Sequence, residues 1–293
     1  FEKIPVELKR IIPQKGNNDE EYLVIKLKAF ENHEAGNLDE AEKYYAALQK
    51  KNPDDPEILY WLAVLKNSQN KKIEAEKLLS LLIDKNSSFS EESYIHLCSI
   101  FIGRKDEKIA EKYFLKGINT FPGSYRLLND YGVFLSGTEK SDEAAGYFEQ
   151  AIKINPLFTD AIFNAAAEAE RKTDYSKAEK YYLKVLEIIP NDFNAYINLA
   201  NMKLKTKKFS EAEEYYKKAL SIKNDFDANN NLGFALQRQN KLEEAELYFL
   251  IALEINPGYG VYYNLGNNFY LKAKFKEAQN YYQKSLEINP YYR

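Results

Sequence analysis

Apolar and small residues recur along most of the chain at steps of three and four positions, with polar residues between them. This spacing places the apolar residues on one face of an α-helix, so the pattern predicts a succession of amphipathic helices. Proline lacks a backbone N–H and disfavours helical geometry in the residue before it, so a helix should end just before each proline that follows the pattern. Such helix ends are predicted at Pro122, Pro156, Pro190, Pro257 and Pro290, with Asn224 in the equivalent place once.

One alanine of this pattern returns eight times at nearly constant spacing. It stands at Ala41, Ala75, Ala110, Ala144, Ala178, Ala212, Ala245 and Ala278, at separations of 34, 35, 34, 34, 34, 33 and 33 residues. A period in this range is typical of a solenoid, in which each unit is too small to bury its own apolar face and stacks on its neighbours. Length alone would allow two domains, but the regular period favours one elongated array.

A second small residue lies twelve positions before each alanine, inside the preceding helical pattern. These residues are Ala29, Ala63, Cys98, Gly132, Ala166, Ala200, Gly233 and Gly266. Glycine costs about 1 kcal/mol relative to alanine in a helix, so we expect a packing reason, namely close approach of the partner helix backbone. The unit therefore consists of two helices that pack against each other.

The last unit shows the full motif, through Tyr262, Leu265, Gly266, Phe269, Ala278, Tyr282, Ser285 and Pro290. This motif resembles the tetratricopeptide repeat (TPR) family, and the resemblance covers about residues 22–292. It implies an all-α fold, a right-handed α/α superhelical solenoid of about eight helix-turn-helix units whose first helices line a concave groove. We expect an N-terminal extension over residues 1–21, with a flexible entry at residues 16–19, and a single solenoid over 22–293. The third unit is lengthened, with Ser87, Ser88 and Ser90 in place of the proline.

The candidate binding residues follow from one column of the predicted first helices. Asn164, Asn198, Asn231 and Asn264 recur in register inside these helices, where asparagine costs about 0.5 kcal/mol relative to alanine. An amide both donates and accepts hydrogen bonds, so such a column can bind the backbone of an extended peptide. An asparagine ladder has this role in some TPR proteins. The alternatives are amides that bond between neighbouring units, or a compositional bias toward asparagine.

The same helix face carries further polar residues. Asn201 and Asn267 lie on it three positions after a ladder asparagine, and Arg171, Lys205 and Arg238 form a basic column at its end. These bases also complement the negative end of a helix dipole. Four hydrogen bonds contribute about 2–6 kcal/mol, whereas micromolar affinity needs about 8 kcal/mol. Charge must therefore add to the ladder, and we expect an acidic or carboxylate-bearing segment to be favoured.

The first half of the chain has different residues in the ladder column. Leu27, Trp61, His96 and Asp130 occupy it, and Tyr60 lies beside Trp61. Tyr60 and Trp61 are candidate apolar anchors for a partner. The alternative is that they cover an irregular interface between the first units, and His96 is expected to be a wall or interhelix residue rather than a general base.

Composition excludes several classes of function. The 41 Lys and Arg residues against 44 Asp and Glu residues leave a net charge of −3, so there is no basic excess for nucleic acid. Cys98, His33 and His96 are the only cysteine and histidines, which leaves no ligand set for a metal site and predicts no cofactor. Cys98 occupies a small-residue position and is expected to be buried. The chain has no apolar run of about 18 residues, so direct membrane insertion is not expected.

These features predict a non-enzymatic scaffold that binds a protein or an extended peptide. The alternative is a substrate-recruiting arm of a larger enzyme such as an O-linked glycosyltransferase, because the chain has no phosphate loop, nucleophile elbow or paired metal ligands. Apolar Tyr282, Leu286 and Ile288 on the last helix would allow self-association through the C-terminal repeat. The chain begins at Phe1, so we expect a preceding segment to have been removed, and location stays open between the cytoplasm and a bacterial periplasm for a soluble protein.

Overall fold

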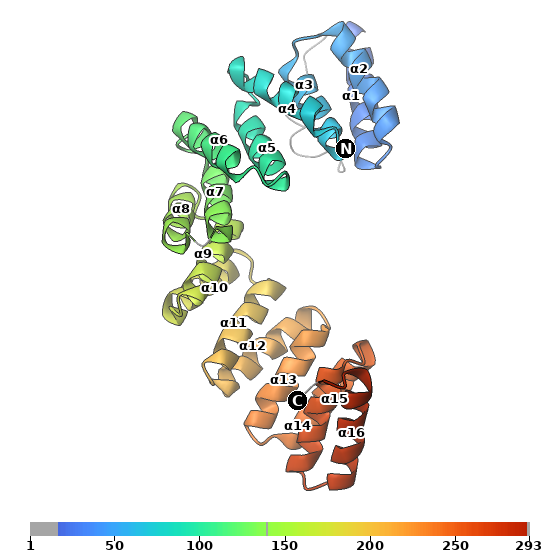
Figure 1. Ribbon diagram of the computed structural model, residues 1–293, viewed down its shortest axis with the longest axis vertical. Helices are drawn as coiled ribbons and strands as arrows, with labels where there is room; N and C mark the ends of the chain where they lie inside the picture. Colours follow the sequence, from blue (N-terminus) through green and yellow to red (C-terminus); the bar gives the residue numbers. More distant parts are fainter. Residues whose placement is uncertain (1–16, 139, 292–293) are drawn as a thin grey trace. The chain divides into compact units, whose positions relative to one another are not determined.

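The computed structural model describes residues 17–138 and 140–291, which form sixteen α-helices and no strand (Figure 1). The odd-numbered helices are the first, or A, helices of eight repeats, and the even-numbered helices are the second, or B, helices. Their bounds are α1 (Asn17–Glu34), α2 (Leu38–Lys51), α3 (Pro56–Ser68), α4 (Lys72–Asp84), α5 (Ser90–Gly103), α6 (Glu107–Thr120), α7 (Tyr125–Gly137), α8 (Ser141–Ile154), α9 (Thr159–Arg171), α10 (Tyr175–Ile188), α11 (Phe193–Lys205), α12 (Phe209–Ile222), α13 (Phe226–Arg238), α14 (Leu242–Ile255), α15 (Tyr259–Leu271) and α16 (Phe275–Ile288). The predicted all-α repeat solenoid is confirmed.

The first helix overlaps the expected N-terminal extension. Helix α1 begins at Asn17, so residues 17–21 of that extension lie in this helix. Residues 1–16 of the extension lie outside the described residues.

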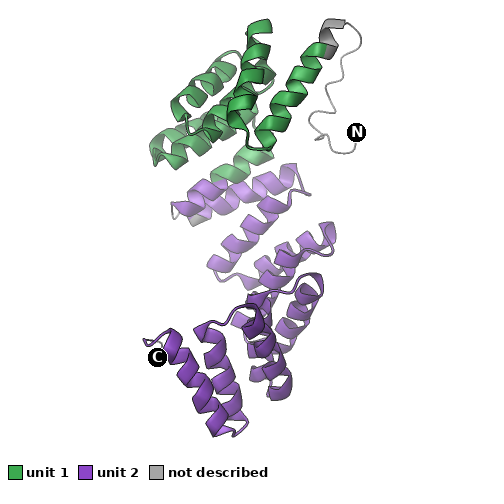
Figure 2. Cartoon of the chain, turned by 90° about the vertical axis from the view of Figure 1, so that its right-hand side faces the viewer, with its two compact units in different colours: residues 1–131 green, residues 132–293 purple. Residues whose placement is uncertain are grey.

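The chain divides into two compact units, Phe1–Tyr131 and Gly132–Arg293, with the division inside α7 (Figure 2). Within each unit, an A helix packs on the B helix of its own repeat, and that B helix packs on the next A helix. In unit 1 this order runs from α1 to α6, and in unit 2 it runs from α8 to α16. Each unit is therefore a stack of helix pairs with a continuous core.

The recurring alanine lies at the centre of that core. All eight alanines are at most 2% exposed, and Cys98 is buried as predicted. A Cβ atom on Gly132, Gly233 or Gly266 would lie 2.5–2.7 Å from an aromatic ring of the B helix, contributed by Phe148, Phe249 and Tyr282 respectively. The close approach behind these glycines is therefore made by a ring, and not by the helix backbone that the sequence suggested.

The turns between A and B helices share one geometry. The second residue after the end of the A helix has a positive φ at Gly36, Asn70, Lys105, Thr173, Lys207, Asn240 and Ala273. At the first of these turns in unit 2, for example, Asp174 N–H donates to the Ala169 carbonyl at 2.9 Å, the bond of a Schellman helix end. The lengthened third repeat uses the same device after α4, where Asn86 has φ 48° and Ser87 N–H donates to Leu82.

Neighbouring repeats are joined by an ion pair that sequence inspection missed. The residue after the recurring alanine is often glutamate, and it accepts from a cation of the next repeat; we call these pairs the glutamate clasps. They are Glu42–Lys66 at 2.7 Å, Glu76–Arg104 at 2.6 Å, Glu179–Lys203 at 2.7 Å, Glu213–Lys241 at 2.7 Å and Glu246–Lys272 at 2.8 Å.

The pKa values of two clasp glutamates show how strongly the clasp holds the carboxylate. Hydrogen bonds from Lys66 and Gln69 lower the pKa of Glu42 to about 2. Burial raises the pKa of Glu213, but hydrogen bonds from Lys217, Lys241 and Gln239 outweigh it and bring the value to about 2. Both carboxylates are therefore ionised at neutral pH and contribute to the repeat interfaces.

Candidate partner-binding surface

The four ladder asparagines occupy the same place in four A helices of unit 2. Asn164 lies in α9, Asn198 in α11, Asn231 in α13 and Asn264 in α15, and all four side chains are half-buried. Asn201 and Asn267 lie one turn further along their helices and are also half-buried. We call these six residues the amide surface. Its members come from successive A helices at intervals of 34, 33 and 33 residues along the ladder.

Part of the amide surface is used for contacts between repeats. Asn231 Nδ2 donates to Asn201 Oδ1 at 3.4 Å, and Asn264 Nδ2 donates to Asn230 Oδ1 at 2.9 Å. Each bond joins the A helices of neighbouring repeats. The alternative that the amides bond between units therefore holds for these two residues. Asn230 was not predicted as a participant, and its only sequence signal is the run of three asparagines at residues 229–231.

Tyrosine hydroxyls of the B helices fix two other members. Tyr216 OH donates to Asn201 Oδ1 at 2.5 Å, and Tyr282 OH donates to Asn267 Oδ1 at 2.8 Å. Burial raises the pKa of both tyrosines, so each hydroxyl stays protonated and remains a donor. These bonds anchor the amide plane of the asparagine and leave its N–H groups to other acceptors.

Asn198 differs from its neighbours. Over residues 17–138 and 140–291 its side chain makes no hydrogen bond, although it is half-buried in the middle of α11. Its free amide can offer two N–H donors and one carbonyl acceptor. Asparagine is a weak helix former, so α11 carries this residue at a cost of about 0.5 kcal/mol with no hydrogen bond in return.

The basic column is less positive than the sequence suggested. Arg171 pairs with Glu168 of its own helix at 2.7 Å, and Lys205 pairs with Glu170 of α9 at 3.1 Å. Arg238 lies over the ring of Phe209, with its guanidinium carbon 5.5 Å from the ring centre. Neither glutamate belonged to the predicted stripe, because both lie beside it on the helix. The net charge available to a partner at this column is therefore carried mainly by Arg238.

The candidate anchors of unit 1 are engaged in packing. Tyr60 is 8% exposed, its ring stacks on Phe89 at 4.9 Å between centres, and its hydroxyl lies 2.9 Å from His96 Nε2. Trp61 is half-buried, with its ring edge-on to Phe30 at 5.7 Å. Burial lowers the pKa of His96, which keeps the imidazole neutral in this contact. The geometry favours the alternative role of Tyr60, a cover between the second and third repeats.

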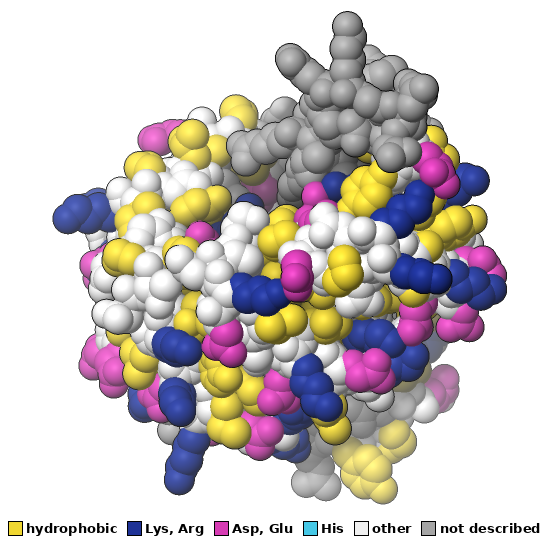
Figure 3. Space-filling model, turned by 90° about the horizontal axis from the view of Figure 1, so that it is seen from above, with side chains coloured by type: hydrophobic (Ala, Val, Ile, Leu, Met, Phe, Trp, Pro, Cys, Tyr) yellow, Lys and Arg dark blue, Asp and Glu magenta, His cyan; other side chains and the backbone are white. Residues whose placement is uncertain are grey.

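The described residues were also inspected for a metal site and for a membrane-spanning helix. No group of three or more His, Cys, Asp or Glu side chains there could hold a metal ion, and none of its helices is long and apolar enough to cross a membrane. Lys and Arg side chains are interspersed with Asp and Glu on the face drawn in Figure 3. This mixture agrees with the glutamate clasps and with the small net charge.

The stacked helix pairs define an α-helical repeat solenoid, a class of protein that presents long surfaces to other molecules. More particularly, the chain belongs to the tetratricopeptide repeat family. Family models described as tetratricopeptide repeat match residues 33–91, 135–193, 193–226, 226–259 and 260–292. Residues 92–134, which lie between two of these matches, hold most of α5 and the whole of α6. A search of curated protein sequences finds no match.

Solved structures show the same fold at low sequence identity. The structure of YrrB, titled a TPR protein with an unusual peptide-binding site, matches with a TM-score of 0.54 at 22% identity, over 61% of this chain and 93% of YrrB. MamA from Desulfovibrio magneticus RS-1 matches with a TM-score of 0.54 at 20% identity, over 57% of this chain and 95% of MamA. These matches establish the fold. Together with the family, they support a protein-interaction scaffold whose architecture resembles that of non-enzymatic scaffold proteins.

Proposed function

We propose that the amide surface of unit 2 binds an extended peptide or an extended segment of a partner protein. The observation that carries the proposal is Asn198, whose half-buried amide makes no hydrogen bond within the described residues. An extended backbone offers N–H and C=O groups to both sides of such an amide. Neighbouring amides keep unused N–H donors, because Asn201 and Asn267 use only the side-chain carbonyl oxygen in their tyrosine contacts.

Hydrogen bonds to the amides supply only part of the binding free energy that such a contact needs. Four hydrogen bonds to the side-chain amides would contribute about 2–6 kcal/mol. Asn231 and Asn264 each already donate one hydrogen bond to a neighbouring repeat. Micromolar binding needs about 8 kcal/mol, so other groups must take part. Arg238 is exposed and has no carboxylate within pairing distance among the described residues, which favours a partner that carries a carboxylate.

A capture experiment tests the amide surface. Asn198→Ala should reduce binding of captured partners about tenfold, because one bidentate backbone contact is worth about 1–2 kcal/mol. The variant should fold at least as well as the parent, since Asn198 has no internal bond and alanine favours helix. Asn280→Ala on α16 is the matched control, because Asn280 is exposed and lies outside the surface. Equal capture by both variants would rule out the amide surface as the site.

The preference for an acidic partner needs its own measurement. Of two peptides of matched length, the one with acidic side chains should bind more tightly than the one with basic side chains. Arg238→Gln should reduce this difference in affinity. A preference for the basic peptide would refute this part of the proposal. The alternative of a substrate-recruiting arm uses the same surface, and no contact of the described residues favours it.

A second proposed contact is self-association through the C-terminal repeat. Helix α16 leaves apolar side chains open, with Leu286 48% exposed and Ile288 50% exposed. The exposure of Ile288 is ordinary, since its equivalents Ile222 and Ile255 are 41% and 44% exposed, but Leu286 is more open than its half-buried equivalents in the preceding repeats and is the residue that favours an interaction surface. Light scattering over a range of concentrations tests it, and a constant monomer mass would refute it.

A further inference from the structure

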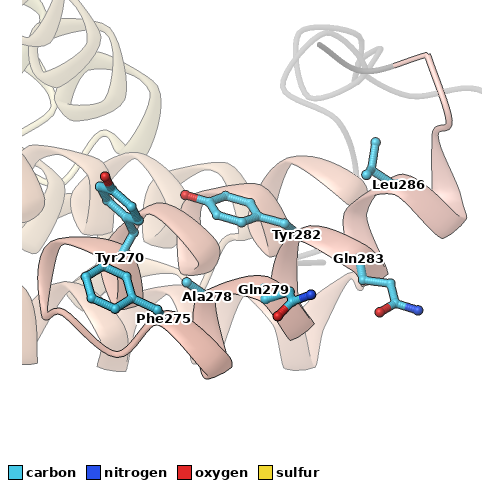
Figure 4. A pocket seen from close by; sticks show the side chains of 7 residues that line it. All are labelled: Tyr270, Phe275, Ala278, Gln279, Tyr282, Gln283 and Leu286. Carbon is cyan, nitrogen blue, oxygen red and sulfur yellow. The ribbon is translucent and has the colours of Figure 1, made fainter.

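The outer face of α16 differs from the same face of every other B helix. In the first seven repeats the large residue four positions after the recurring alanine is at most 2% exposed, because the next repeat covers it; these residues are Tyr45, Leu79, Phe114, Phe148, Tyr182, Tyr216 and Phe249. Tyr282, their equivalent in α16, is only half-buried. Beside it lies an open pocket of about 450 Å³, lined by Tyr270, Phe275, Ala278, Gln279, Tyr282, Gln283 and Leu286 (Figure 4).

The lining of this pocket is apolar at both ends. Phe275 is 61% exposed and lies beside Tyr270 at one end, while Leu286 lies at the other end, with Tyr282 and Gln279 between them (Figure 4). The Phe275 and Tyr270 rings contact each other at 5.5 Å between centres. Phe275, Gln279, Tyr282 and Leu286 follow one another at steps of four, three and four residues, which places them in one stripe along the helix.

The residue that follows the recurring alanine bears on what could cover this stripe. The position after the recurring alanine carries Glu42, Glu76, Glu179, Glu213 and Glu246 wherever a cation of the next repeat forms a clasp. In α16 the same position is Gln279. At a clasp, a covering helix brings a cation for which Gln279 offers no carboxylate; α8, with Ala145 at this position, packs on α9 without such a glutamate. A neutral amide instead tolerates a second copy of itself, because it donates and accepts, whereas two carboxylates near a symmetry axis would repel.

The rim of the stripe is complementary to itself. Lys276 directly follows Phe275 and Glu287 directly follows Leu286, so these two residues of opposite charge lie on the same side of the stripe, at its two ends. Two copies of α16 in antiparallel arrangement bring Lys276 of each toward Glu287 of the other. The same arrangement sets Phe275 against Leu286 of the second copy and Gln279 against Tyr282. A parallel arrangement would set like charges against each other.

We propose that the occupant of this face is a second copy of the chain, whose α16 lies antiparallel to the first about a two-fold axis between Gln279 and Tyr282. This inference rests on the self-association proposed for the C-terminal repeat and specifies its geometry. An interface of one helix face belongs to the size class below about 1,200 Å², which is typical of weak association. Because the contact is isologous, assembly stops at the dimer.

A matched pair of substitutions tests the face. Leu286→Glu places a charge in the apolar stripe and should weaken dimerisation about tenfold or more, the effect of losing a buried leucine. Leu247→Glu on α14 is the control, because Leu247 is 55% exposed and lies away from α16. Multi-angle light scattering from micromolar to millimolar concentration should show the control dimerising like the parent. Equal dimerisation of both variants would overturn the proposal.

A charge exchange tests the antiparallel geometry. Lys276→Glu and Glu287→Lys should each weaken dimerisation, since each creates like-charged pairs across the axis. The double variant Lys276→Glu with Glu287→Lys restores both pairs and should recover dimerisation to within about threefold of the parent. A double variant no better than the singles would refute the antiparallel contact. Growth of the parent mass beyond twice 34.1 kDa would also refute it, because an isologous contact closes at two copies.

Failure of this geometry can be separated from failure of self-association. A parent chain that stays monomeric at millimolar concentration refutes both, whereas a parent dimer that ignores the charge exchange refutes the geometry alone. The amide surface is tested independently, because Asn198→Ala should leave the dimer unchanged, and Leu286→Glu should leave peptide capture unchanged.

Discussion

The ladder column of the A helices has different chemistry in the two units. In unit 2 it carries Asn164, Asn198, Asn231 and Asn264, which lie half-buried among other amides. In unit 1 it includes Trp61 and His96, which pack with Phe30 and Tyr60. The frame around the column is the same in both units, since each has the buried alanine and the glutamate clasps. The column is therefore free to vary while the repeat is kept.

This difference teaches where interaction capacity lies. In unit 1, aromatic rings fill the space between neighbouring A helices, and the hydroxyl of Tyr60 is already engaged by His96. In unit 2, amides bridge the A helices and still offer hydrogen-bonding groups, with Asn198 wholly unengaged among the described residues. Packing fills the column in unit 1, whereas the amides of unit 2 keep hydrogen-bonding groups that the proposed peptide contact would use.

The largest effect should come from a core substitution that separates the two units. Phe249→Ala removes a fully buried ring from unit 2 and should lower the free energy of unfolding by about 3–5 kcal/mol. Trp61 is the only tryptophan and lies in unit 1, so its fluorescence follows unit 1 while far-UV circular dichroism follows all helices. Solenoid repeats couple mainly to neighbours, so in urea the dichroism midpoint should fall and the Trp61 midpoint should hold.

Phe114→Ala is the matched substitution in unit 1, because Phe114 is 1% exposed at the equivalent position of the third repeat. It should shift the Trp61 midpoint. If Phe249→Ala shifts that midpoint as far as Phe114→Ala does, the two units unfold as one cooperative body and the comparison between them fails for stability.

A clasp substitution in unit 2 should have a smaller effect on stability than the core substitution. Glu213→Gln removes the charge that accepts from Lys241 and Lys217 and should lower the free energy of unfolding by about 1–2 kcal/mol at pH 7. The folded pKa of Glu213 is about 2, below the unfolded value of about 4.3. The clasp therefore stabilises fully above the unfolded value and loses its effect as pH falls toward 2.

Glu214→Gln is the control for the clasp, since Glu214 is the next residue of α12 and is exposed. Its effect should stay within about 0.5 kcal/mol. Urea titrations at pH 7 and pH 3 measure the free energy of unfolding of both variants, and the difference between these two free energies should be smaller at pH 3. A difference that is the same at both values would show that packing, and not charge, accounts for the clasp.

The sequence predicted the repeat frame because periodicity encodes it. The spacing of Ala41 through Ala278 marks the buried centre of each B helix, and the prolines mark where those helices end. The clasps were missed because their cations come from different places in the next repeat: Lys66 lies inside an A helix, whereas Lys241 lies in a turn. A pair without constant spacing leaves no periodic signal, although its glutamate recurs in one register.

The sequence predicted the helix face of the candidate residues, but not their contacts. Its helix face follows from the register, so the half-burial of Asn164 through Asn264 agrees with the expected column. Which amide is engaged depends on side-chain rotamers and on residues off the column, such as Asn230 and Tyr216. Glu168 and Glu170 reduce the basic column in the same way, from positions beside the stripe. Pattern analysis locates a face, but it does not determine which groups on it are already paired.

The smallest predicted effect uses the fact that both histidines, His33 and His96, lie in unit 1. Burial lowers the pKa of each below its ordinary value of about 6.5. As pH falls from 7 to 5, the unfolded chain therefore binds protons that the folded chain resists, and unit 1 loses stability. The urea midpoint of Trp61 fluorescence should fall over this range. His96→Asn, which introduces the ladder residue of unit 2, should flatten that dependence more than His33→Asn, because the Tyr60 contact buries His96 more deeply. A Trp61 midpoint that falls as steeply in the double variant would assign the effect to carboxylates instead.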